Sequence, residues 1–198
     1  MDLQALYDWI FHQNADGSGL SLKTMGLTLG VLLLAFHLLA LLRAEQMMKM
    51  AKAFSRSRGW GVVLMVIAGA WGVFLMAHMD MGEFFNWRER LEITLPATVV
   101  LMTVYVPEFL AVRALGSLLL LAASPVLHAA FLQPQMSRLL LPVLAYMWII
   151  AGMYFVGMPY LLRDWITWCS DKPVRWRMAA LGGAAYGAVM LVAAVLWY

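Results

Sequence analysis

Six long apolar segments alternate with short polar ones along this chain, and the pattern predicts a bundle of transmembrane helices. A helix that crosses the hydrocarbon core of a bilayer needs about 20 mostly apolar residues. Segments of about this length lie at residues 24–42, 60–79, 93–111, 115–132, 139–162 and 178–197. We therefore expect an all-α, polytopic integral membrane protein in which residues 1–198 form a single transmembrane domain.

A shorter pattern precedes the first apolar segment. Leu3, Leu6, Tyr7 and Ile10 recur at helical spacing, and Asp8 falls among them. An amphipathic segment of this kind is typical of a helix that lies in the plane of the membrane surface. We expect a short interfacial helix here, ended by the turn-forming residues 14–19.

The central stretch, residues 92–132, is long enough for two crossings and predicts a transmembrane hairpin. Its turn is expected near Arg113 to Ser117, close to the middle of the stretch. One crossing followed by a re-entrant segment is the alternative. That arrangement would invert the C-terminal part of the chain relative to the bilayer.

Composition supports the membrane interpretation. Hydrophobic residues make up 64% of the chain and charged residues 13%, with a mean hydropathy of +0.78. A soluble domain carries about 45–50% apolar and about 25% charged residues. The net charge of +3 comes from short segments between the apolar ones. We interpret these cations as orientation signals and expect no nucleic-acid partner.

The positions of the cations predict which way the chain crosses the membrane. With the N-terminus outside, the inner segments hold ten Lys and Arg residues and the outer segments hold four. The ten are Arg43, Lys49, Lys52, Arg56, Arg58, Arg113, Arg163, Lys172, Arg175 and Arg177, and the four are Lys23, Arg88, Arg90 and Arg138. The positive-inside rule therefore places both termini outside the cytoplasm. Short loops and the lack of an organelle signal favour a bacterial inner membrane.

Two pairs of glycines have the spacing of a helix-packing motif. Gly26 and Gly30 form one GxxxG pair, and Gly183 and Gly187 form the other. Glycine at this spacing lets a second helix approach closely. We expect both faces to pack on protein, either within this chain or in a neighbouring subunit.

Glu108 and Arg113 are the charged candidates within the central stretch. A charge inside the hydrocarbon core costs about 2.5–3.5 kcal/mol on insertion scales, so it usually has a partner or a function. One interpretation is proton or cation movement through Glu108. The alternative is an interfacial pair that caps the hairpin.

His78 and His128 are the candidate cofactor ligands. Both are expected near the outer ends of their helices, at similar depth, as a bis-histidine haem b requires. His37 is expected toward the inner side and does not join them. The alternative is that each histidine is a polar residue hydrogen-bonded between helices.

A methionine and histidine cluster is the sharpest local pattern. Met76, His78, Met79 and Met81 together offer thioether and imidazole ligands, which suit Cu(I). Yet the 16 methionines are spread through the whole chain, and methionine also serves as an adaptable packing residue. Copper binding and packing both stay open, and the cofactor, if there is one, is not identified by the sequence.

No nucleophile–base pair, phosphate-binding loop or zinc-protease motif occurs in the chain. The sequence therefore favours a non-enzymatic accessory or structural subunit of a larger membrane complex, with the lipid bilayer and other membrane subunits, or copies of itself, as partners. A small transporter or channel that uses Glu108 is the first alternative. A haem- or copper-binding protein that uses His78 and His128 is the second.

Overall fold

A computed structural model describes residues 2–12 and 19–198, and all regular secondary structure within these residues is helical. The α-helices are α1 (Leu3–Phe11), α2 (Leu22–Leu42), α3 (Ala44–Phe54), α4 (Arg58–His78), α5 (Arg88–Tyr105), α6 (Leu110–Ala130), α7 (Leu140–Gly157), α8 (Tyr160–Asp171) and α9 (Pro173–Leu196). Two short 3₁₀ helices, η1 (Gly82–Trp87) and η2 (Met136–Leu139), lie in connections. The predicted turn at 14–19 falls largely outside the described residues.

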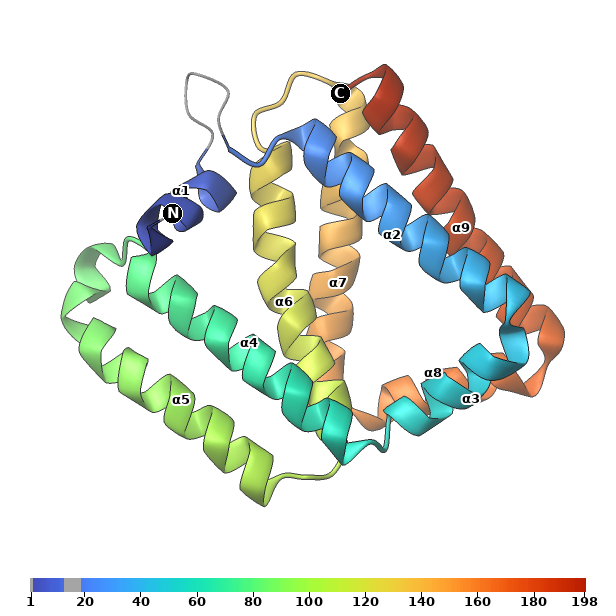
Figure 1. Cartoon of the computed structure of the whole chain (residues 1–198), viewed down its shortest axis with the longest axis horizontal. Helices are drawn as coiled ribbons and strands as arrows, with labels where there is room; N and C mark the ends of the chain where they lie inside the picture. Colours follow the sequence, from blue (N-terminus) through green and yellow to red (C-terminus); the bar gives the residue numbers. More distant parts are fainter. Residues whose placement is uncertain (1, 13–18) are drawn as a thin grey trace.

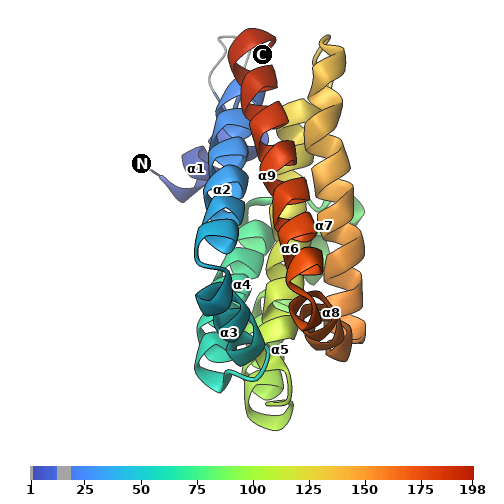
Figure 2. The same ribbon diagram turned by 90° about the vertical axis from the view of Figure 1, so that its right-hand side faces the viewer.

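The long helices form three antiparallel pairs (Figure 1). The α6/α7 pair stands in the centre, with α2/α9 leaning away on one side and α4/α5 on the other. The short helices α3 and α8 pack against each other at one end of the molecule, as Figure 2 also shows. We call this the basic end, and the opposite end, with α1 and the C-terminus, the terminal end.

Five helices in the described part of the chain are long and apolar enough to cross a membrane, and together they make this a multi-pass helical membrane protein. They are α2, α4, α6, α7 extended by η2, and α9. The remaining long helix, α5, starts with the sequence Arg-Glu-Arg-Leu-Glu and so carries four charges in its first five residues. Its crossing, the third of the six expected from the sequence, stays a prediction.

The connection between α5 and α6 lies earlier in the chain than the turn predicted at Arg113 to Ser117. Helix α5 ends at Tyr105 and α6 begins at Leu110, so the connection consists of residues 106–109. Val106 precedes Pro107 and leaves the helical region, with φ −123° and ψ 59°, because the proline ring crowds the residue before it. Phe109 then takes a left-handed conformation with φ 55°. Arg113 is consequently in the first turn of α6.

A second proline divides the predicted span at 139–162. Helix α7 stops at Gly157, and α8 begins at Tyr160 after the Met158–Pro159 step. The charged segments 43–58 and 163–177 are also more helical than expected, since they contain α3, α8 and the start of α9. Pro173 occupies the first turn of α9, where a missing N–H has no cost.

The two GxxxG faces pack against each other. A Cβ atom on Gly30 would lie 2.7 Å from Leu191 Cγ, and one on Gly187 would lie 2.7 Å from the backbone nitrogen of Leu34. Gly26 faces the Tyr198 ring in the same way, and Gly183 faces the His37 ring. These four glycines therefore bring α2 and α9 into backbone contact, and their packing surface is used inside the chain.

A similar contact joins the central pair. Gly116 on α6 and Gly152 on α7 face each other, and a Cβ atom on either would lie 2.8 Å from the carbonyl oxygen of the other. Lipid chains are as apolar as leucine, so helices in a bilayer associate through close van der Waals contact of this kind.

We expect Gly187→Ala to destabilise the fold by about 1–3 kcal/mol, because the new methyl group meets the α2 backbone and overpacks the interface. Unfolding in mixed detergent micelles, followed by circular dichroism, measures the change. Gly182→Ala is the matched control, since no atom lies within 4 Å of a Cβ built at that position. Equal stability of the two variants would contradict this account of the α2/α9 contact.

Candidate functional site

A large cavity lies at the basic end, between the α2/α9 pair and helices α4 and α6, with α3 and α8 as its floor. Its volume is about 760 Å³. Most of its walls are apolar side chains. Phe36 and Ala40 line it from α2, Trp60 from α4, Leu115 from α6, and Trp176 from α9.

His37 is a polar side chain in the cavity wall. Its Nδ1 atom lies 2.7 Å from the carbonyl oxygen of Leu33. A carbonyl oxygen only accepts, so Nδ1 carries the proton, and Nε2 is the acceptor of the neutral ring. The ring edge rests on Gly183, where a Cβ atom would collide with it. The hydrogen bond to Leu33 within α2 thus sets the tautomer of His37, and the contact with Gly183 on α9 limits the position of its ring.

Two further residues, Trp176 and Cys169, line the cavity near α3 and α8. The indole nitrogen of Trp176 donates to the carbonyl oxygen of Ala40 at 2.8 Å, which satisfies one of the free carbonyls at the end of α2. Cys169, the single cysteine of the chain, is buried on α8 and lines the cavity. Burial raises the pKa of its thiol, and the nearby Arg175 partly opposes this shift. Its thiolate fraction at neutral pH is therefore small.

Glu108 and Arg113 are separated in the structure. Glu108 is exposed in the 106–109 connection. Arg113 is half-buried on α6, and its Nη1 donates to the carbonyl oxygen of Val156 at 2.6 Å. Among the described residues, no ion pair joins Glu108 to Arg113. Arg113 instead ties α6 to the last turn of α7, where backbone carbonyls lack helical partners.

We expect Arg113→Gln to destabilise the protein by about 1–3 kcal/mol, because the shorter side chain leaves the Val156 carbonyl without its donor. The melting transition in detergent measures this loss. Arg56→Gln serves as the control, since Arg56 is exposed at the same end of the molecule. A melting temperature unchanged in both variants would show that the Arg113 hydrogen bond contributes nothing to stability.

His78 and His128 both contact α1 at the terminal end. The Tyr7 ring stacks on His78 at a centroid distance of 6.3 Å, and Phe11 meets His128 edge-on at 5.4 Å. His78 Nδ1 donates to the carbonyl oxygen of Phe74, so its Nε2 is the free ligand atom. Burial and the charge of Asp8 raise the pKa of Tyr7. Helix α1 packs over both histidines, and nothing in the structure tests the predicted haem site.

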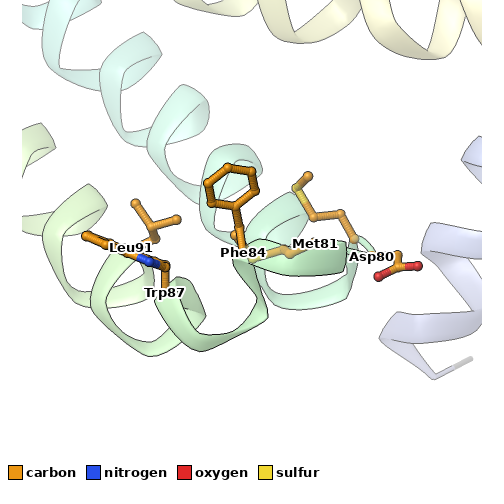
Figure 3. A pocket seen from close by; sticks show the side chains of 6 residues that line it. Asp80, Met81, Phe84, Trp87 and Leu91 are labelled. Carbon is orange, nitrogen blue, oxygen red and sulfur yellow. The ribbon is translucent and has the colours of Figure 1, made fainter.

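The methionine and histidine cluster spans the C-terminal end of α4: Met76 and His78 lie within the helix, and Met79 and Met81 follow it. Met79 and Met81 line a second cavity of about 430 Å³ beside η1, together with Asp80, Phe84, Trp87 and Leu91. Figure 3 shows the Asp80 carboxylate set apart from the Phe84, Trp87 and Leu91 side chains. Within the described residues, no group of three or more His, Cys, Asp or Glu side chains has metal-binding geometry. Copper binding by Met76, His78, Met79 and Met81 is not tested by this arrangement and stays a prediction.

Sequence reasoning missed the cavity at the basic end. Trp165 and Trp176 line this cavity from α8 and α9, and no sequence pattern predicted that they would share one site. The available signal was the combination of large tryptophans with small residues, such as Ala179 and Ala180, next to two basic segments. That combination has many arrangements in space, and only the tertiary contacts select one.

Comparisons with known proteins add no further constraint. A scan against protein-family models and searches of curated proteins and of solved structures find no match to this chain.

Proposed function

We propose that this membrane protein is a non-enzymatic accessory subunit of a larger membrane complex, and that it packs against another subunit through α5. One observation carries the proposal. Helix α5 is the most polar of the long helices and lies at the edge of the bundle, with each of its 18 residues described and none of them buried.

The contacts of α5 within the chain are limited to one side. Val99 and Leu95 pack on the small-residue face of α4 at Gly69 and Gly72. The exposed positions include apolar residues, such as Val100 and Val104, and also Thr94 and Thr98. A second protein surface is the natural partner for such a mixed face.

Energetics favour protein over lipid as that partner. Charged and polar side chains are costly in the hydrocarbon core and usually face protein or water. The Thr98 hydroxyl already bonds to the Thr94 carbonyl, and Thr103 to the Val99 carbonyl. Arg88 donates to the carbonyl oxygen of Met79, and Arg90 lies over the Trp87 ring. Among the described residues, no ion pair neutralises the charges of Glu89 and Glu92. A partner helix that covers α5 would shield its first two turns from lipid.

The same proposal includes an orientation. The ten cations of the inner segments gather at the basic end, while Lys23, Arg88, Arg90 and Arg138 belong to the other end. We place the basic end in the cytoplasm by the positive-inside rule, and both termini on the other side of a bacterial inner membrane.

A photo-crosslinking amino acid at Val100 or Val104 is expected to form a covalent adduct with one defined partner in native membranes. Leu32 on α2 is the matched control, since its side chain is 59% exposed against 60% and 56% for the α5 positions. Gel analysis and mass spectrometry identify the adducts. Equal or absent adducts at all three positions would contradict the subunit proposal. An adduct between two copies of this chain would make a homo-oligomer the assembly.

Glu108→Gln separates the subunit proposal from the transporter alternative. Glu108 is exposed in a connection, so we expect proton flux through reconstituted vesicles to be the same for the variant and the native protein. Glu83→Gln, exposed in η1, controls for the loss of one negative charge. A flux that falls tenfold or more in Glu108→Gln alone would favour the transporter.

A further inference from the structure

The cavity at the basic end has the size of a ligand site. Its volume of about 760 Å³ falls within the range of about 300–1,000 Å³ that is typical of small-molecule sites. The four long helices α2, α4, α6 and α9 form its walls, and the packed pair α3/α8 closes it on the basic side. An occupant must therefore be mostly apolar and must enter from the side.

Three aromatic residues mark the side openings. Phe36 on α2, Trp60 on α4 and Trp165 on α8 line the cavity, yet they are 57%, 58% and 57% exposed. A side chain that both lines a cavity and is largely exposed lies at its mouth. The openings at Phe36 and Trp60 border α2 and α4, which are apolar enough to cross the membrane, so these two openings face lipid. An apolar volume offers water no hydrogen-bond partners, and an acyl chain fills it with dispersion contacts instead.

The cations beside the cavity favour a lipid with an anionic headgroup. The apolar face of α3, which includes Met47, Met50 and Phe54, lines the cavity. Lys49 and Lys52 on the other face of α3 are exposed, as are Arg56 and Arg58 in the segment that follows. No ion pair joins any of these four to an acid among the described residues. Each cation near a membrane surface favours an anionic lipid by about fivefold in affinity.

We propose that the cavity binds an anionic phospholipid from the leaflet at the basic end. One acyl chain enters between α2 and α4 and fills the cavity, and the phosphate-bearing headgroup stays at the surface beside Lys49, Lys52 and Arg56. The site does not involve α5, so it goes beyond the proposed subunit function and is tested separately from it.

The first test is native mass spectrometry of the full chain in mild detergent, with phosphatidylglycerol or phosphatidylcholine of identical acyl chains. We expect one phosphatidylglycerol adduct, at least tenfold more abundant than the phosphatidylcholine adduct. Ala179→Trp, which fills the cavity from its edge, is expected to reduce the adduct tenfold. Ala185→Trp, exposed on the same helix but outside the cavity, is the matched control and keeps it.

The second test changes charge without changing the cavity. Lys49→Gln with Lys52→Gln is expected to lower the preference for phosphatidylglycerol over phosphatidylcholine by about 25-fold. Lys23→Gln with Arg90→Gln removes two cations at the terminal end and is expected to leave the preference unchanged. This pair of variants decides the proposal if Ala179→Trp does not fold. Equal binding of the two lipids by the native protein, equal adducts in the two tryptophan variants, or a non-lipid mass in the cavity would overturn it.

Discussion

Backbone contact at small residues is the interaction on which this structure depends. In a bilayer there is little hydrophobic force between helices, so close van der Waals packing, together with interhelical hydrogen bonds, holds them together. Gly30 and Gly187 provide it for α2 and α9, and Gly116 and Gly152 provide it for α6 and α7. The contacts within α2/α9 and within α6/α7 are extensive, and α4 packs more extensively on α6 than on α5, whereas the α2/α9 pair makes few contacts with the other long helices. The α2/α9 pair leans away from α6/α7 toward the basic end (Figure 1). The large cavity lies there, between α2/α9 and helices α4 and α6.

The short helices α3 and α8 close this gap on the basic side and leave it open at the sides. A core of Val112, Leu162 and Ile166, with Phe54 packed against it, joins them to the start of α6. Each short helix directs apolar side chains toward the protein interior, and α3 keeps its cations on the outside. The same amphipathic pattern thus lines the cavity with apolar side chains and places the cations of α3 on the outside, where the proposed anionic lipid headgroup would meet them.

The two proposed interactions use different parts of the molecule. The lipid site belongs to the basic end between α2 and α4, whereas the proposed subunit contact belongs to the outer face of α5. The GxxxG faces, which the sequence offered as surfaces for a partner, are already occupied by each other. A partner subunit therefore has to use a surface that the sequence did not single out, and α5 is the most polar surface of this kind.

The sequence by itself determined the helical membrane class, the approximate positions of five of the six predicted spans and the segregation of charge, because apolar length and cation position act locally along the chain. It also identified Gly26, Gly30, Gly183 and Gly187 as packing residues, although not their partners. Only the tertiary structure decided that these glycines meet, that Arg113 bonds to Val156, and that Trp60, Trp165 and Trp176 surround one cavity. Those outcomes depend on contacts between residues far apart in the chain, and helical periodicity shows which face of a helix is apolar but not which neighbour covers it.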